Sequence, residues 1–134
     1  MEAKAYLEQV ERLDLMIATA QRKVNKLKAT ATSTSASMSG ERVASSGSKG
    51  KMADAVIQYT DIEREEILPL KRKKEDILRN LQKLKGRVEF LVLYEHYFNK
   101  KQFKIIALET RLSYSHIIRS HNCGLAQLQK IIGE

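Results

Sequence analysis

The chain has 134 residues, a net charge of +8 and an isoelectric point near 9.6, so its length fits one domain, or a small domain attached to a helical arm. The basic charge favours an anionic partner, nucleic acid or an acidic membrane face, although solubility alone can also explain such a charge. No stretch reaches the ~18 apolar residues of a membrane span, no signal peptide is recognised, and Cys123 is the only cysteine, so a soluble cytoplasmic protein is expected.

Residues 3–28 are expected to form a helix. Apolar side chains recur at spacings of three and four, a pattern typical of a helix that packs along a seam. Acidic residues dominate the early turns and basic residues the late ones, as the helix dipole prefers. The expected seam positions are Tyr6, Val10, Leu13, Ile17, Ala20, Val24 and Leu27.

Residues 29–51 are rich in Ser, Thr, Ala and Gly, which bury little apolar area. They are expected to form a long flexible loop. This loop is longer than a connection between two helices needs, so both a passive linker and a functional segment remain open.

The apolar period resumes at Met52 and continues to about residue 85, with Pro69 expected to kink this second helix rather than end it. Gly86 is expected to cap its C-terminus. Two narrow apolar stripes suit an antiparallel helical hairpin, a dimeric coiled coil, or both. The sequence therefore predicts an all-α fold, with a hairpin arm over 1–85 and a separate domain over 86–134.

Three short helices are expected in the C-terminal domain, at 87–98, 102–109 and 113–131, the last two joined by a turn of about four residues. This arrangement is typical of a helix-turn-helix, whose second helix lies in a DNA major groove. Ser113 is expected to cap the third helix, and Arg111 stands where such turns usually have glycine. The expected core comprises Val88, Leu91, Val92, Tyr94 or Tyr97, Phe103, Ile106, Ala107, Leu112, Ile117, His121 or Ser120, Leu125 and Leu128.

Two groups of residues are predicted to contact DNA. The exposed face at the start of the third helix carries Tyr114, Ser115, His116, Ile118 and Arg119. Of these, Arg119 can form a bidentate pair with guanine. The backbone phosphates are expected to be held by Lys100, Lys101, Gln102 and Lys104, with Arg111 in the turn between the helices.

A metal site and an enzyme are both disfavoured by the same segment. His121 and Cys123 are two residues apart on one helix and point about 200° apart, which does not suit a shared zinc ion. A nucleophilic Cys123 would need a fixed base and a pocket, which a thin helical arm does not offer. We therefore expect neither catalysis nor a cofactor.

The segments Leu93–Phe98, Ile106–Ala107 and Leu112–Ser113, with Ile117 and Leu125, resemble region 4 of bacterial sigma factors. The chain is still more similar to sigma-related transcription regulators of phages and mobile elements of Gram-positive bacteria, the RinA/ArpU type. In the arm, residues 39–43 and 45–54 are similar to one branch of that group. The resemblance covers about residues 3–130 and implies a phage late-gene activator that binds near a promoter and contacts RNA polymerase.

By this likeness the groove-reading role falls on residues 114–119, and Arg119-Ser-His121 matches the Arg-x-His segment of the group. Gly124 stands where the group commonly has Ala, and Arg111 where it has Gly. A complete sigma factor is excluded because no cluster of aromatic residues upstream could hold melted bases. The alternatives are a small terminase subunit that recognises DNA for packaging, and an inhibitor that binds a protein through the arm.

Overall fold

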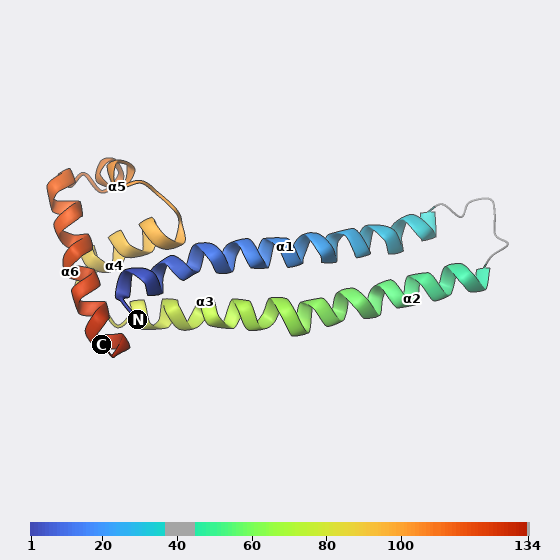
Figure 1. Ribbon diagram of the computed structural model, residues 1–134. Helices are drawn as coiled ribbons and strands as arrows, with labels where there is room; N and C mark the ends of the chain where they lie inside the picture. The colour runs from blue at the N-terminus through green and yellow to red at the C-terminus, as the bar shows by residue number, and fades with distance from the viewer. Residues whose placement is uncertain (37–44, 134) are drawn as a thin grey trace. The chain divides into compact units, whose positions relative to one another are not determined.

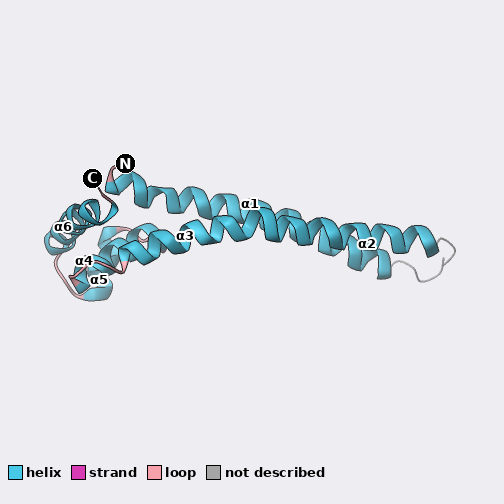
Figure 2. Cartoon of the chain, turned by 90° about the horizontal axis from the view of Figure 1, so that it is seen from below, coloured by secondary structure: helices cyan, strands magenta, loops and turns pink. Residues whose placement is uncertain are grey.

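The computed structural model describes the backbone of residues 1–36 and 45–133 and the side chains of residues 1–32 and 52–133. Every element in these residues is a helix, and the described part of the chain contains no strand (Figures 1 and 2). The expected all-α class is confirmed. The α-helices are α1 (Ala3–Ala36), α2 (Ser45–Ile62), α3 (Leu68–Leu81), α4 (Arg87–Leu93), α5 (Phe103–Thr110) and α6 (Tyr114–Ile132), with π-helical turns η3 (Glu63–Ile67) and η4 (Tyr94–Phe98).

The chain forms two compact units that divide both long helices. One unit joins Met1–Asp14 to Lys73–Glu134, and the other comprises Leu15–Arg72. A boundary at residue 85/86 was expected from the sequence, whereas the first turns of α1 and the end of α3 belong with the C-terminal helices. Apolar spacing shows which face of a helix is buried, but it does not show which partner buries it.

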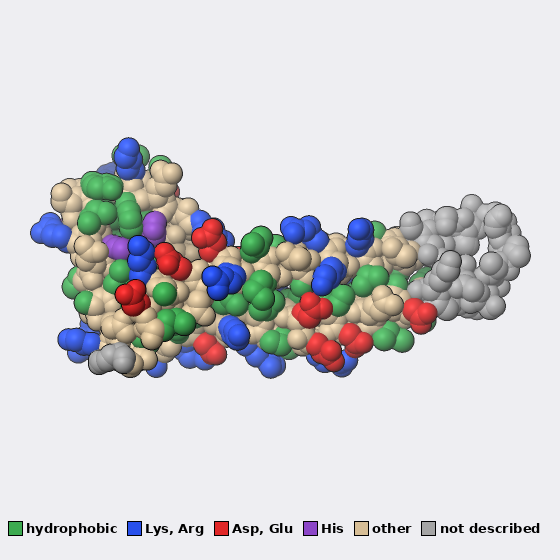
Figure 3. Space-filling model, in the orientation of Figure 1, with side chains coloured by type: hydrophobic (Ala, Val, Ile, Leu, Met, Phe, Trp, Pro, Cys, Tyr) green, Lys and Arg blue, Asp and Glu red, His purple; other side chains and the backbone are tan. Residues whose placement is uncertain are grey.

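In the unit Leu15–Arg72, α1 packs antiparallel against the later helix. Ala20 and Val24 of α1 form a buried cluster with Ile67. Two ion pairs have the order that antiparallel helices require, since the later lysine pairs with the earlier glutamate. They join Lys23 to Glu66 and Lys28 to Glu63, each at 3.6 Å. Figure 3 shows the basic side chains of one helix facing acidic side chains of the other. Exposed pairs of this kind add little stability, so apolar contact carries the packing.

The flexible loop expected over 29–51 is wrong at both ends, where the structure has helix. Helix α1 runs to Ala36 and α2 begins at Ser45, while residues 37–44 lie outside the described part of the chain. The hydroxyls of Thr30 and Thr32 donate to the carbonyls of Lys26 and Lys28, one turn earlier. Threonine can therefore satisfy its side chain inside a helix, an outcome that composition alone does not predict.

Pro69 does not end its helix. The five residues of the π-helical turn η3 come just before α3, in which Pro69 is the second residue. The amide of Leu68 donates to the carbonyl of Glu63, five residues earlier. A wider turn of this kind accommodates the proline ring, which would otherwise clash with a carbonyl four residues back.

The three C-terminal helices share one core. Val92, Ile106 and Ile117 form its fully buried centre, with Val88, Phe103, Ala107 and Leu112 packed around it. One expected core position is wrong, because Leu91 is 37% exposed. Leu93, which was not expected in the core, is completely buried. Leu93 is buried because its side chain lies against Gly124 of α6, a contact between distant residues that apolar spacing does not reveal.

Helix α6 buries Ile117, Ser120, Gly124 and Leu128, whereas Leu125 is only half-buried. Gly124 lies against α4, because a Cβ atom added there would come 2.9 Å from Leu93 Cδ1 and 3.3 Å from Glu89 Cβ. Alanine at this position would therefore overpack the contact between α4 and α6. The glycine accounts for the close approach of the two helices.

Two further contacts tie the chain's first residues to its last helix. The amide of Ala3 donates to Gln129 Oε1 at 2.7 Å, and Gln129 Nε2 donates to the Met1 carbonyl at 3.1 Å.

Gly86, expected to cap the end of the preceding helix, has an extended backbone and is the N-cap residue of α4 instead, because α3 has already ended at Leu81.

Candidate nucleic-acid interface

The start of α6 has the local structure that the sequence predicted. The amide of His116 donates to Ser113 Oγ at 3.1 Å, which confirms the expected cap. Three residues separate α5 from α6, and Arg111 among them has the left-handed conformation at φ 62° and ψ 28°. A side chain in this conformation costs about 1 kcal/mol compared with glycine. The turn is therefore short and tight despite the absence of glycine.

The predicted reading residues lie together on the first turns of α6. Tyr114 is 51% exposed. Ser115 and Arg119 are exposed, while His116 and Ile118 are half-buried. The exposed side chains lie beside a helix N-terminus, where unpaired amides and the helix dipole favour negative charge.

Arg119 is available for a ligand. Its Nε makes a long hydrogen bond of 3.4 Å to the Ser115 carbonyl, one turn earlier. No carboxylate lies within 4 Å of its guanidinium among the residues whose side chains are described. The two terminal nitrogens can therefore donate to a base edge or a phosphate.

Some lysines of the predicted phosphate clamp form ion pairs within the chain, and one does not. Lys101 Nζ lies 2.7 Å from both Glu95 Oε2 and Glu109 Oε1, and Lys100 Nζ lies 2.6 Å from Asp14 Oδ2. Gln102 and Lys104 are exposed, and Lys104 has no ion-pair partner within the described side chains. Lys104 is thus free for phosphate, whereas Lys100 and Lys101 are neutralised by their own chain.

Carboxylates near these lysines have low pKa values. The hydrogen bond from Lys101 lowers the pKa of Glu95 more than burial raises it. Burial raises the pKa of Asp14, but hydrogen bonds from Lys100 and Lys74 outweigh that effect and leave the pKa below its usual value of 3.8. Both carboxylates therefore stay ionised near neutral pH, and the ion pairs persist there.

A cluster of aromatic and histidine side chains lies beneath this surface, and sequence reasoning missed it. His96 stacks on Phe103 with ring centres 4.1 Å apart, and Tyr97 Oη lies 2.8 Å from His121 Nε2. Burial raises the pKa of Tyr97 to about 12, with a smaller contribution from the charge of Glu8. The residues come from η4, α5 and α6, and their spacing along the chain gives no signal of this contact.

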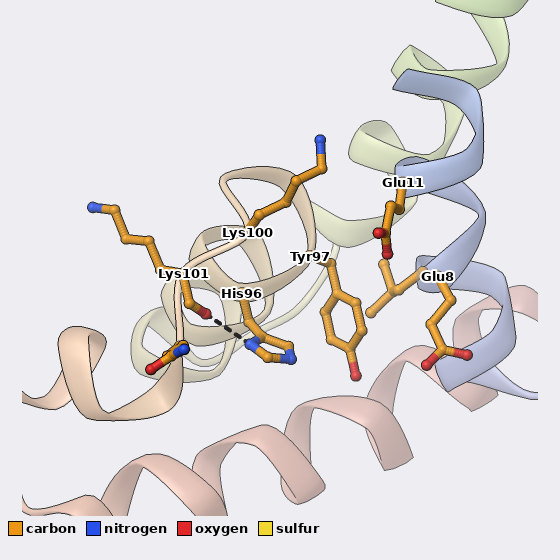
Figure 4. Close-up of a pocket in the computed structure, with 8 residues that line it drawn as sticks. Glu8, Glu11, His96, Tyr97, Lys100 and Lys101 are labelled. Atoms are coloured by element: carbon orange, nitrogen blue, oxygen red, sulfur yellow. Dashed lines mark hydrogen bonds between the residues drawn. The ribbon is translucent and has the colours of Figure 1, made fainter. Parts of the chain in front are cut away.

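The same cluster borders a pocket of about 270 Å³, lined by Leu7, Glu8, Glu11, His96, Tyr97, Lys100, Lys101 and Gln102. Figure 4 shows the ring of His96 directed to the Lys101 carbonyl, which lies 2.8 Å from its Nδ1. The ammonium groups of Lys100 and Lys101 point away from this ring in the same view. The pocket therefore presents acidic side chains and imidazole rather than a phosphate-binding surface.

Burial of His121 predicts a pH-dependent stability. Burial lowers the pKa of His121 below its ordinary value of 6.5. The unfolded chain then binds a proton more readily than the folded chain, so stability is complete above pH 6.5 and falls as the pH drops from 6.5 toward the folded-state pKa. We expect a lower melting temperature at about pH 5.5 than at neutral pH.

His121→Gln should remove most of that difference, as measured by thermal melts at both pH values. His116→Gln serves as the matched control, because His116 lies on the same helix outside the cluster, and it should keep the wild-type dependence. An unchanged pH response in His121→Gln would assign the effect to other groups.

Cys123 is exposed, and His121 is engaged with Tyr97. The described side chains include no group of three histidine, cysteine, aspartate or glutamate residues placed to hold a metal ion.

Within the described helices, none is both long and apolar enough to cross a bilayer. No protein-family model, curated protein or solved structure matches this chain.

Proposed function

We propose that this protein is a sequence-specific DNA-binding transcription regulator in which α5 and α6 form a helix-turn-helix. Helix α6 would enter the major groove with Tyr114, Ser115 and Arg119, and His116 and Ile118 would border the contact. The antiparallel helices α1 and α2–α3 would form a hairpin arm that presents this domain and provides a surface for self-association.

One observation carries the proposal: the exposed first turns of α6 follow a three-residue turn and present an arginine without a carboxylate partner within the described residues. An arginine at such a position can donate two parallel hydrogen bonds to guanine. The net charge of +8 supports the same class of partner, because a basic protein attracts polyanions over long range.

Lys104, Gln102 and Arg111 would hold the DNA backbone, each of them exposed at an end of α5. Lys100 and Lys101 would contribute little while their carboxylate partners remain in place. This distribution differs from the clamp expected from sequence, in which all the lysines had the same role.

The resemblance to the sigma-related regulators of phages and mobile elements supports a role for this DNA binding in the activation of transcription. The protein would act in a bacterial cytoplasm as an activator beside a promoter and would contact RNA polymerase. It would recruit or adapt the polymerase rather than melt DNA.

Selection of bound duplexes from a random oligonucleotide pool tests the proposal. We expect one preferred sequence, and Arg119→Ala should weaken binding to it by about 1–3 kcal/mol and relax the preference at one base pair. Arg79→Ala, which removes an arginine paired with Asp76 on α3, should leave binding unchanged. Equal losses for Arg119→Ala on preferred and random duplexes would contradict its role as a base reader.

The salt dependence separates free lysines from paired ones. Lys104→Ala should weaken binding to all sequences alike and reduce the slope of log K against log salt by about one unit. Lys101→Ala should change the slope less, because Glu95 and Glu109 compete with phosphate for its ammonium group. A terminase subunit would instead assemble into a ring at a packaging site, and an arm-based inhibitor would bind no duplex at all.

A further inference from the structure

Three aromatic rings form a continuous stack along α4 and η4. Phe90 and Tyr94 lie 5.7 Å apart with planes 18° from parallel, and Tyr94 and Phe98 lie 5.2 Å apart at 15°. At the far end, Lys74 Nζ lies 5.9 Å from the ring centre of Phe98. The stack therefore has a cation at one end, and Phe90 forms the other.

An open groove of about 410 Å³ begins where the stack ends. Phe90 is part of its wall, together with Leu84, Lys85, Gly86, Arg87 and Leu91. Leu91 is 37% exposed although its helix buries the neighbouring Val92 and Leu93 completely. The groove thus combines aliphatic side chains with the last ring of an aromatic stack.

The rim of the groove carries two basic side chains, and the carboxylate of Glu89 lies against the backbone of Gly86, which separates them in sequence. Lys85 and Arg87 are exposed, and neither has a carboxylate within 4 Å among the described side chains. This differs from Lys74, Lys100 and Lys101 of the same unit, all of which have ion-pair partners. An occupant with apolar and acidic groups would match both the walls and the rim.

We propose that this groove docks a segment of a partner protein in which an aromatic side chain is flanked by acidic residues. The aromatic ring would continue the stack beyond Phe90, between Leu84 and Leu91, and the carboxylates would pair with Lys85 and Arg87. Aromatic anchors in apolar pockets surrounded by charges are the usual source of affinity in such contacts. The proposal goes beyond DNA reading, and none of the predicted DNA contacts lines this groove.

Two other occupants fit less well. A nucleobase has polar edges, and the walls Leu84, Phe90 and Leu91 have no polar side chain to satisfy them. A second copy of the chain would need an exposed aromatic residue with acidic neighbours. The exposed aromatic residue among the described side chains is Tyr114, and its sequence neighbours Arg111 and Arg119 are basic rather than acidic.

Synthetic peptides test the proposal on the full chain. The probe is a short peptide with one tryptophan between aspartate and glutamate residues, and because the protein has no tryptophan, its fluorescence reports the peptide alone. We expect a saturable blue shift of the emission. Replacing the tryptophan by alanine or the acidic residues by lysine should weaken binding by about tenfold or more. Because the alanine peptide has no fluorescence, its binding is measured from shifts in the amide resonances of residues 84–91 of the protein.

Leu91→Asp and the double variant Lys85→Glu/Arg87→Glu should each weaken the peptide by about tenfold, because one disrupts the wall and the other the rim. Leu108→Asp, at a 74% exposed position on α5, is the matched control and should bind the peptide normally. Circular dichroism melts establish that each variant is folded. All of these variants should still bind duplex DNA. If the parent protein bound no DNA, the proposed function would fail, but the peptide result would still test the groove.

Three results would overturn the proposal. The emission could stay unshifted at high peptide concentration, or Leu91→Asp could bind as well as the parent. Displacement of the peptide by a duplex without a matching resonance change on α6 would assign the groove to nucleic acid. Sedimentation showing a dimer that Leu91→Asp dissociates would assign it to a second copy.

Discussion

Leu7→Ala should lower the free energy of unfolding by about 2–5 kcal/mol. Leu7 is completely buried in the first turns of α1, within the unit that holds the C-terminal helices, and it lines the same pocket as Tyr97. Truncation would leave a cavity, and the small gain in helix propensity from alanine would not offset it. Urea denaturation followed by circular dichroism measures the change.

Leu15→Ala is the matched control on the same helix. Leu15 is 63% exposed, so its truncation should change stability by no more than about 0.5 kcal/mol. Leu7→Ala should also alter the near-ultraviolet dichroism of the tyrosines, because Tyr97 lines the same pocket. Equal effects of the two substitutions would mean that the start of α1 does not complete the C-terminal unit.

A second large effect is expected for Ile117→Ala, which should destabilise the protein by about 2–5 kcal/mol. Ile117 is fully buried on α6 and packs with Val92 and Ile106, so it joins all three C-terminal helices. Thermal and urea denaturation should both report the loss. Binding of DNA should weaken only as far as the folded fraction falls, because Ile117 itself is inaccessible.

Ile105→Ala removes the same atoms from a position on α5 that is 42% exposed. We expect a change within about 0.5 kcal/mol and unaltered folding. If Ile105→Ala were the more damaging of the two, α5 would have to present its opposite face to the core.

Local features of the C-terminal helices were predictable from sequence. The expected first helix at 87–98 coincides with α4 and η4 together, and the cap by Ser113 follows from its position before an apolar-periodic run. Hydroxyl caps and turns depend on neighbouring residues alone, so their signal is present in a short window.

Contacts between distant segments were not predictable. The pairing of Lys100 with Asp14 joins residues 86 positions apart, and nothing near either residue indicates it. The lysines that looked alike in sequence therefore differ in the folded chain, since some are neutralised and Lys104 is not. The burial of Leu93 rather than Leu91 has the same origin, because Leu93 lies against Gly124, 31 residues later in the chain.

The ion pairs along the two long helices also determine which alignments are disfavoured. Lys23 faces Glu66 and Lys28 faces Glu63. Sliding one helix by a heptad toward α3 would bring Lys23 opposite Lys73, so a slipped alignment would exchange attraction for repulsion. Added residues between the two helices would leave this register intact. A seven-residue insertion within α1 before Lys23 would keep the apolar period, but with the first turns of α1 in place it would move Lys23 and Lys28 away from their acidic partners.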